Sequence, residues 1–337
     1  MKSTLCQIPV GEIMMKNSDI SSNISRSCLS VTRREFLIKH GQAAIFAAAA
    51  AKSGLIFPGM AQSFQSPDIA VAGGGPEKGV KTVVELLGGM GSFVKSGNQV
   101  VIKPNMSFAH PPERATNTHP EVVRILAEMC VEAGASSVTV LDNPLQSPEL
   151  CIERSGIEKA CSQVPKTSVR ALSSGRFFDK VSIEQGKHFK ETEVMREVLE
   201  ADVLIAAPVA KSHSATGVSL SMKGMMGLIR DRGIMHRRFN LSSAIVDLCT
   251  FLKADLTVID ATRVLASHGP FGPGEVIRAD MVIASPDMVA ADAMAIDMFP
   301  WYGRDVLPRN VAHVLEAHER GLGRMDLENL VVKRVAA

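Results

Sequence analysis

Short apolar runs alternate with amphipathic segments along most of this 337-residue chain, and this alternation limits the fold more than any other feature. Runs rich in β-branched residues have the length of buried strands at 69–72, 99–103, 138–142, 203–207, 256–260 and 281–284. Segments with the helical spacing of apolar residues lie at 79–87, 121–133, 150–161, 241–252, 288–298 and 310–320. Apolar strands separated by helices are typical of a parallel sheet covered on both faces. The sequence therefore predicts an α/β fold with a largely parallel, doubly wound sheet.

One segment, residues 167–200, interrupts this alternation. It contains Ser173-Ser174-Gly175, a run with hairpin character at 177–184 and a charged stretch at 187–193. We expect a small inserted hairpin subdomain here rather than a linker. Residues 62–337 are numerous enough for one large core, so the prediction is a single α/β domain that carries this insertion.

The N-terminal region has the features of a twin-arginine export leader. Arg33 and Arg34 precede Phe36-Leu37, an alanine-rich apolar stretch follows at 43–57, and Gly59-Met60-Ala61 resembles a cleavage site. We therefore predict a signal peptide at residues 1–61, an exported, periplasmic location, and the twin-arginine export machinery as a partner. The apolar stretch of about 15 residues is too short for a stable membrane span, which needs about 20. Two alternatives stay open: an uncleaved leader that anchors the protein to the membrane, and a short buried helix.

Charge and cysteine content exclude several classes of protein. Residues 1–61 hold 7 of the 37 Lys and Arg residues and 3 of the 35 Asp and Glu residues, which leaves 30 basic and 32 acidic side chains in the rest. This balance argues against a nucleic-acid binder, and we expect membrane contact only through the leader. The later cysteines form no C-x-x-C motif, so an iron–sulfur cluster is not expected, whereas a divalent metal stays open. Cys151 and Cys161 are either a disulfide pair or separate buried thiols.

Polar loops follow several of the predicted strands, and open α/β sheets bind ligands at the carboxyl ends of their strands. The first loop begins at Lys103 and Asn105 and reaches His119 just before a predicted helix. A lysine beside a helix N-terminus suits a phosphate or carboxylate, so we expect Lys103 and Asn105 to bind a ligand and His119 to act as a catalytic base or a ligand. The alternatives are a solvent-exposed Lys103 and a His119 that only packs at the helix start.

A later loop is the strongest candidate for a site. It brings Lys211 and His213 close in sequence to Lys223 and Gly224, in a stretch rich in small residues whose backbone can approach an anion. We predict that Lys211 and His213 are catalytic and that Lys223 and Gly224 bind the ligand. The intervening methionines are expected to pack in the core. A basic cluster at 230–238 is either a solvated face or an extension of the same pocket.

Two aspartates and a glycine–proline loop complete the candidates. Asp142 and Asp260 each end a predicted strand, where an aspartate either contacts a ligand or caps a turn. The loop at 268–274 alternates glycine and proline, so it is rigid, and its backbone at Gly272 and Gly274 can approach a ligand. Asp292, on a helix of small residues, is expected to be a buried cap or packing partner.

Several ordered motifs resemble the domain of unknown function 362 family over residues 69–335. They are Val101-Ile102-Lys103-Pro104-Asn105, Thr118-His119-Pro120-Glu121-Val122-Val123, Lys211-Ser212-His213 after Pro208, Lys223-Gly224-Met225-Met226-Gly227-Leu228, Asp260 with the loop to Gly274, and Ala290-Ala291-Asp292-Ala293. The resemblance implies no established activity. Some relatives carry ferredoxin-type cysteine clusters, which this chain lacks, so no iron–sulfur function is implied. Relatives commonly have an Asp-Ser-Pro-Gly-like turn at Asp142, and the sequence here differs, so the resemblance does not support a phosphate cradle at that turn.

These features together predict an exported enzyme or cofactor-binding protein that holds an anionic small molecule at the strand carboxyl ends, with or without a metal. The expected neutralising groups are Lys103, Lys211 and Lys223. His119 or His213 is expected to move protons or bind a metal, and Asp142 and Asp260 to orient the histidine or complete a metal shell. The alternative is a non-catalytic exported protein that binds a ligand or assists the maturation of another exported enzyme.

Overall fold

A computed structural model describes residues 66–336, and the predicted leader at residues 1–61 lies outside this range. The main sheet has ten strands: β1 (Ile69–Gly73), β2 (Gln99–Pro104), β3 (Ser137–Asp142), β4 (Thr167–Ala171), β7 (Val203–Ala207), β8 (Val209–His213), β9 (Gly217–Ser219), β10 (Leu256–Leu265), β11 (Val276–Ser285) and β12 (Val332–Val335). Their order is β12-β1-β11-β10-β7-β2-β3-β4, with β8 beside β10 and β9 beside β8. Strands β4, β3, β2, β7 and β10 are parallel neighbours, whereas β11 is antiparallel to β10 and β1. The predicted α/β fold is confirmed, with an antiparallel part that the sequence did not indicate.

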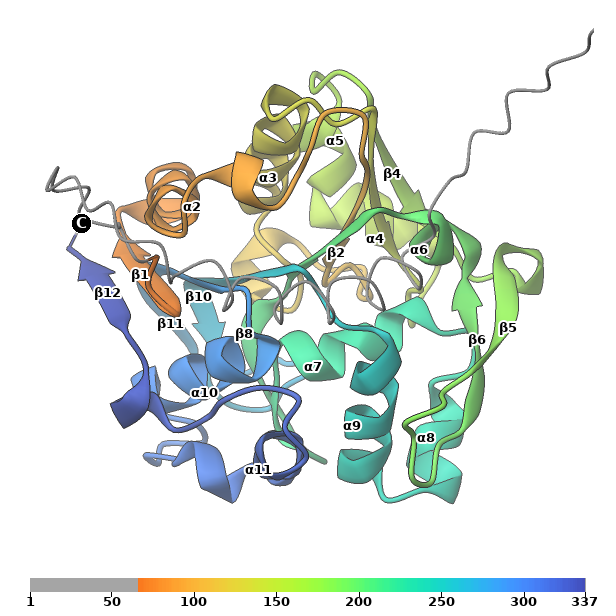
Figure 1. Cartoon of the computed structure of the whole chain (residues 1–337), viewed down its shortest axis with the longest axis vertical. Coiled ribbons are helices and arrows are strands. Elements are labelled where there is room, and N and C mark those ends of the chain that lie inside the picture. The colour runs from red at the N-terminus through yellow and green to blue at the C-terminus, as the bar shows by residue number, and fades with distance from the viewer. Residues whose placement is uncertain (1–65, 337) are drawn as a thin grey trace, which may run out of the picture. The chain divides into compact units, whose positions relative to one another are not determined.

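Helices cover both faces of the sheet, as Figure 1 shows. One face packs against α2 (Gly75–Leu86), α3 (Pro120–Glu132), α4 (Pro148–Ser155) and α5 (Ile157–Cys161). The other packs against α7 (Ser221–Gly224), α9 (Leu241–Phe251), α10 (Met288–Met298) and α11 (Ala312–Glu319). Along β2, Val100 and Ile102 join the first core and Val101 joins the second, because successive side chains of a strand point to opposite faces. The helix expected at 150–161 is two helices, since Gly156 has a φ of 71° between α4 and α5.

The connections of the sheet change direction between β2 and β7. The chain leaves β2 through α3 toward β3, and it leaves β7 toward β10 on the opposite side. Neighbouring strands whose connections diverge leave a crevice at their carboxyl ends, which is the usual ligand site of open α/β sheets. At this point β2 ends in Lys103-Pro104, and Pro208 separates β7 from β8.

The segment expected to be an insertion divides between two sheets. Residues 167–171 form β4, the edge strand of the main sheet, and only β5 (Phe178–Ser182) and β6 (Glu191–Met195) form a separate antiparallel pair. The run at 177–184 is thus only the first strand of a longer hairpin. The edge strand escaped the sequence analysis because it contains no apolar run and is only partly buried.

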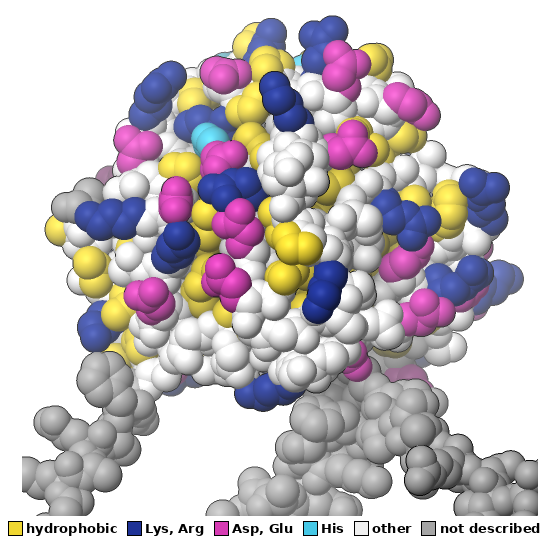
Figure 2. Space-filling model, turned by 90° about the horizontal axis from the view of Figure 1, so that it is seen from above, with side chains coloured by type: hydrophobic (Ala, Val, Ile, Leu, Met, Phe, Trp, Pro, Cys, Tyr) yellow, Lys and Arg dark blue, Asp and Glu magenta, His cyan; other side chains and the backbone are white. Residues whose placement is uncertain are grey.

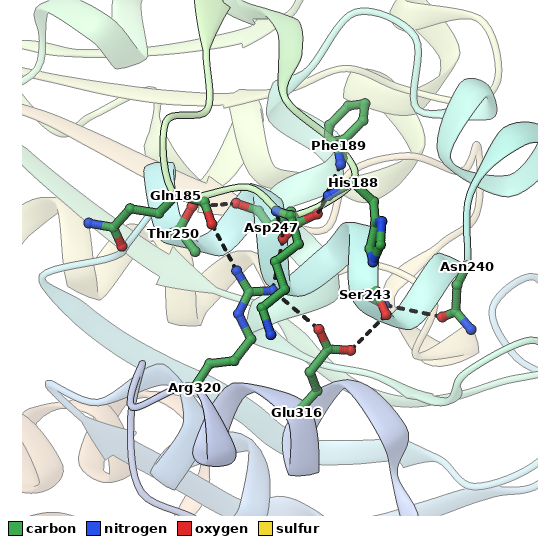
Figure 3. A network of polar contacts seen from close by, with 10 residues as sticks. Gln185, His188, Phe189, Asn240, Ser243, Asp247, Thr250, Glu316 and Arg320 are labelled. Atoms are coloured by element: carbon green, nitrogen blue, oxygen red, sulfur yellow. Dashed lines mark hydrogen bonds and ion pairs between the residues drawn. The ribbon is translucent and has the colours of Figure 1, made fainter.

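A buried aspartate on α9 fixes the turn of this hairpin (Figure 3). Asp247 accepts hydrogen bonds from the backbone N–H groups of residues 187–189 at 2.8 to 2.9 Å. Arg320, which follows α11, donates to Asp247 Oδ1 at 2.8 Å and to the carbonyl of Gln185 at 3.0 Å. Burial opposes the ionisation of Asp247, but the backbone donors and Arg320 outweigh it and lower its pKa. The network therefore ties the hairpin, α9 and the end of α11 together.

The face over α2, α3 and α5, seen in Figure 2, carries basic and acidic side chains side by side. Neither sign gathers into a patch on this face. The helices within residues 66–336 include none that is long and apolar enough to cross a membrane.

Candidate anion-binding site

A cavity of about 360 Å³ lies at the end of β2, between the loop that follows this strand and the segments β8, α7 and α8 (Gly233–Arg238). Its basic lining residues are Lys103, Lys211, Lys223, Arg232, Arg237, His213 and His236. No aspartate or glutamate of the described residues is among those that line it. The cavity is thus strongly cationic and lies where the change in sheet direction predicts a ligand site.

Lys103 is paired with a buried carboxylate at one wall of the cavity. Its Nζ lies 3.3 Å from Oδ1 of Asp142, and the two side chains are 2% and 0% exposed. Asp142 Oδ2 accepts hydrogen bonds from the backbone N–H of Met106 and the hydroxyl of Ser107, both at 2.8 Å. Burial lowers the pKa of Lys103, although the charge of Asp142 opposes this shift. Asp142 therefore supports a lysine, and it does not orient a histidine as the sequence analysis expected.

A glycine allows the backbone to pack directly on this ion pair. A Cβ atom at Gly227 would lie 2.3 Å from Asp142 Oδ1 and 2.5 Å from Lys103 Cε. The Gly227 carbonyl accepts a hydrogen bond from the N–H of Asn143 at 2.9 Å, which holds the two segments together. Only glycine fits at this position without moving the pair.

Lys211 has neutral partners only. Its Nζ donates to the carbonyl of Thr116 at 2.6 Å and lies 5.3 Å from the centroid of the Phe108 ring. Burial, followed by the charges of Lys103 and Lys223, lowers the pKa of Lys211 to about 7. A lysine with this pKa is partly neutral at physiological pH and can accept a proton.

Two further cations of the cavity lack a contacting carboxylate. Within residues 66–336, the Lys223 side chain makes no hydrogen bond or ion pair, and the buried Nη2 of Arg232 has no hydrogen-bond partner. Burial, followed by the charges of Arg232 and Lys103, lowers the pKa of Lys223 to about 8. Burial also lowers the pKa of Arg232, although Asp142 opposes it. Both side chains are partly buried, and a cation removed from water is unfavourable unless an anion compensates it.

Asp292 holds the short helix that presents Lys223. Its Oδ1 accepts hydrogen bonds from the N–H and the hydroxyl of Ser221 at 2.8 and 2.6 Å, and its Oδ2 accepts one from the N–H of Met222 at 3.0 Å. Burial raises the pKa of Asp292 to about 7. The expectation that Asp292 is a buried cap is confirmed, because it anchors the start of α7.

His213, at the end of β8, is a neutral imidazole. Its Nδ1 accepts a hydrogen bond from the N–H of Ala215 at 3.1 Å, so the proton of the neutral ring lies on Nε2. Burial, followed by the charges of Lys223 and His236, lowers the pKa of His213 to about 3. The ring stacks on that of His236 with a centroid separation of 6.4 Å. At neutral pH His213 can donate a hydrogen bond to a ligand but is a weak base.

Two predicted residues lie apart from these cations. Asp260 Oδ2 accepts from the backbone N–H of His119 at 2.7 Å, and its Oδ1 accepts from that of Thr262 at 3.0 Å, so it orients backbone and no imidazole. His119 Nδ1 accepts from the N–H of Glu121 at 3.1 Å and caps α3. His119 lines a second cavity of about 190 Å³, and Asp260 lines neither. Neither residue therefore lines the cavity that contains Lys211 and His213.

The glycine–proline loop reaches the cavity through Pro270, whereas Gly272 and Gly274 do not line it. A Cβ atom at Gly274 would lie 1.9 Å from the Ser267 carbonyl oxygen, and Gly272 has a φ of 74°. These two glycines are therefore required by the conformation of the loop itself. The predicted ligand-binding residues Asn105 and Gly224 do line the cavity.

The basic cluster at 230–238 extends the cavity, which settles a question that the sequence left open. Arg232, His236 and Arg237 line it, whereas Arg230 is paired with Glu193 at 3.0 Å on the surface. The sequence analysis missed Phe108, which lines the cavity from the loop after β2. An aromatic side chain in a polar loop at a strand carboxyl end was the available signal.

Metal ligands and disulfides were also considered in the sequence analysis. The described part of the chain has no group of three or more His, Cys, Asp or Glu side chains placed to hold a metal ion. Cys151 and Cys161 are free and buried, as are Cys130 and Cys249. Of the two alternatives left open for Cys151 and Cys161, the structure shows separate buried thiols. The side chains gathered in the cavity suit an anion better than a metal cation.

Comparisons with known proteins show which chains this one is similar to. The chain is 26% identical over 228 residues to "Thylakoid-associated protein sll1697" of Synechocystis sp. (strain ATCC 27184 / PCC 6803 / Kazusa), covering 65% of this chain and 68% of that protein. Among solved structures, the lactate racemase apoprotein from Thermoanaerobacterium thermosaccharolyticum matches 70% of this chain and 58% of its own, with 13% identity and a TM-score of 0.42. A protein from Thermotoga maritima matches 56% of this chain and 51% of its own, with 17% identity and a TM-score of 0.30. The chain spans less than two thirds of either solved structure.

A family model matches residues 100–297, which include β3, the residues that line the cationic cavity, and all but one residue each of β2 and α10. This match covers more than half of the chain. The chain therefore belongs to the family described as "Domain of unknown function (DUF362)".

Proposed function

We propose that this protein binds an anionic small molecule in the cavity at the end of β2 and acts on it by proton transfer. The observation that supports this best is the charge of the lining, which contains five Lys and Arg side chains and no carboxylate of the described residues. Oxyanions such as carboxylates and phosphates are the ligands that such a set of donors recognises.

Lys211 is the group that we assign to proton transfer, and His213 is the group that stabilises the charge on the ligand while the proton moves. Lys211 exchanges a proton with the ligand, because its pKa of about 7 in the anion-free site lets this amine gain or lose a proton near physiological pH. His213 donates a hydrogen bond from Nε2–H to an oxygen of the ligand, because its ring is neutral and its Nδ1 already accepts a hydrogen bond from Ala215. Lys223 and Arg232 hold the negative charge of the ligand.

One observation favours a non-catalytic alternative, in which the protein only retains its ligand or delivers it to another exported enzyme. Lys211 Nζ is held by the Thr116 carbonyl, and Lys103 is held by Asp142, so both amines are fixed as binding groups would be. In that case binding tolerates the loss of His213 but not the loss of Lys103 or Lys211.

The test combines binding with isotope exchange. Native mass spectrometry of the protein purified from its own host identifies the retained anion, and calorimetry with that anion compares wild type with Lys211→Ala. We expect Lys211→Ala to weaken binding at least about tenfold, the loss of one charge-assisted hydrogen bond. Lys180→Ala, which removes an exposed lysine on β5, is the matched control. Equal affinities of wild type and Lys211→Ala would refute the assignment of the site.

Incubation of the protein and its anion in D₂O then separates the two functions. Proton transfer incorporates solvent deuterium into the ligand, and His213→Ala is expected to slow this exchange more than it weakens binding. Tight binding without any exchange would support the non-catalytic alternative.

We also propose that the protein is exported by the twin-arginine pathway, on the basis of Arg33, Arg34 and the apolar stretch that follows them. Changing both arginines to lysine is expected to retain the protein in the cytoplasm, as measured by cell fractionation. Arg26→Lys, the same change outside the motif, is the control. Unchanged export of the double variant would contradict this proposal.

A further inference from the structure

The balance of charge in the cavity points to the class of ligand, an inference that rests on the function proposed above. We propose that the ligand carries at least two negative charges, as a phosphomonoester or a dicarboxylate does. The groups that hold it are Lys211, Lys223 and Arg232.

Two of the five Lys and Arg side chains that line the cavity are already paired with carboxylates. Lys103 is paired with Asp142 inside the protein at 3.3 Å. Arg237 is paired with Asp231 at 3.2 Å, where both side chains are more than half exposed. These two cations therefore require no charge from the ligand.

The other three cations have no carboxylate of their own. Lys211 contacts only the Thr116 carbonyl and the face of the Phe108 ring. Lys223 makes no hydrogen bond or ion pair within residues 66–336, and the buried Nη2 of Arg232 has no hydrogen-bond partner. Lys211 is buried and the other two are partly buried, so a ligand with one negative charge would leave two cations uncompensated where water screens them poorly, which is unfavourable. Two or more charges bring the site close to balance.

The size and walls of the cavity limit the rest of the ligand. A volume of about 360 Å³ lies at the low end of the range for small-molecule pockets, about 300 to 1,000 Å³. Phe108, Leu145, Met226 and Pro270 supply apolar lining beside the cations. A compact metabolite with a short carbon body fits this combination, and a long polyanionic chain does not.

Binding of such an anion is expected to take up protons. The pKa values of Lys211 and Lys223, about 7 and 8, are low because of burial first and then because of the positive charges of neighbouring cations. A bound dianion favours their charged forms and raises both values, so near pH 8 the complex holds more protons than the free components. Net proton uptake on binding is thus independent evidence that the ligand contacts these lysines.

The experiment compares acetate, inorganic phosphate and succinate by calorimetry at constant ionic strength and pH 8, in two buffers of different ionisation enthalpy. We expect phosphate and succinate to bind at least about tenfold more tightly than acetate, with net proton uptake. Arg232→Gln and, separately, Lys223→Gln should reduce this preference severalfold. Arg196→Gln removes the same charge from an exposed pair with Asp179 on the hairpin and should leave the preference unchanged.

The outcomes separate the two proposals. If acetate binds as tightly as phosphate and succinate, the inference about charge is wrong, although anion binding itself stands. If the retained natural ligand identified by mass spectrometry carries a single negative charge, the inference is also wrong. If none of the three anions and no natural ligand binds, the proposed function fails together with it. Unfolding curves of each variant show whether a lost preference reflects the site or the fold.

Discussion

Two clusters of buried charge in this protein are built in opposite ways. Around Asp247, one carboxylate meets three backbone N–H groups and the guanidinium of Arg320, so acceptor and donors match (Figure 3). Around the cavity, Asp142 is the carboxylate among several cations, and it pairs with Lys103 while Lys211 makes only neutral contacts. The first cluster is complete in the described residues, and the second lacks negative charge.

This difference separates groups that stabilise the fold from groups that await a ligand. A buried charge with all its partners in place fixes segments relative to one another, whereas a buried charge without them lowers stability. The Asp247 network joins the hairpin to α9 and α11, far along the chain from β2. The cations of the cavity come from separate segments and converge on open space. Substitutions in the two clusters should therefore change stability with opposite signs.

The largest change in stability is expected from a substitution in the Asp247 network. Asp247→Ala leaves three backbone donors without an acceptor and removes one of the two carboxylates that Arg320 contacts, the other being Glu316 at 3.2 Å. It should therefore lower the free energy of unfolding by about 3–5 kcal/mol. Urea unfolding followed by circular dichroism measures this loss, and Arg320→Met should produce a similar one. Anion binding by the folded fraction should be unchanged. A loss below about 1 kcal/mol, the range of surface pairs, would contradict the comparison.

A substitution among the cations of the cavity should change the free energy of unfolding in the opposite direction. Lys211→Met removes a cation that lacks a carboxylate, so at pH 6, without an anion, it should raise the free energy of unfolding by about 1–4 kcal/mol. The same variant should lose affinity for the anion. Lys180→Met on the exposed surface of β5 is the control and should change stability by less than about 0.5 kcal/mol. A lower free energy of unfolding in Lys211→Met would show instead that this lysine stabilises the fold.

A smaller effect is expected where the backbone packs on the Lys103–Asp142 pair. Gly227→Ala places a Cβ atom 2.3 Å from Asp142 Oδ1, so the pair must move, at a cost of about 1–3 kcal/mol in stability. Gly224 is the matched control, because a Cβ atom there has no other heavy atom within 4 Å. Equal stability of Gly227→Ala and Gly224→Ala would mean that the pair tolerates displacement. Thermal unfolding of the two variants makes this comparison.

Most of the sheet could be predicted because its central strands are continuous apolar runs. Strands β1, β2, β3, β7, β10 and β11 all contain the runs at 69–72, 99–103, 138–142, 203–207, 256–260 and 281–284. The missed strands lack this signal for two reasons. The edge strands β4 and β12 are partly exposed, and β8 is polar because it carries Lys211 and His213.

The cationic site could be predicted in part, because parallel strands end at one edge of the sheet. This rule brought Lys103 and Lys211 together correctly, although they are 108 positions apart. It also grouped His119 and Asp260 with them, since a strand end says nothing about the direction of the loop that follows. The pairing of Lys103 with Asp142, and the close approach of Gly227, depend on side-chain packing that no sequence pattern encodes.

The smallest effect is expected in the pH dependence of stability, that is, in the change of the free energy of unfolding that each cavity lysine contributes per pH unit. In the anion-free protein the pKa of Lys211 is about 7 against an ordinary value of 10.5, and that of Lys223 is about 8. At a pH between the folded-state pKa of each lysine and its ordinary value of 10.5, the unfolded chain holds more protons than the folded one. Raising the pH from 7 toward 10.5 therefore stabilises the fold. Each lysine contributes at most about 1.4 kcal/mol per pH unit.

Urea titrations at pH 7, 8 and 9 should therefore give a rising free energy of unfolding in wild type and a flatter dependence in the Lys211→Met/Lys223→Met double variant. Asp247 gives no slope in this window, because its lowered pKa lies far below it. Saturating phosphate should flatten the wild-type slope as well, since a bound dianion raises the pKa of both lysines in the folded state. Equal slopes in wild type and double variant would place the titrating groups elsewhere. If the free energy of unfolding rises with pH in wild type, and if phosphate or the double substitution abolishes this rise, then Lys211 and Lys223 are the titrating groups. The negative charge that these lysines lack in the free protein would then be supplied by the ligand.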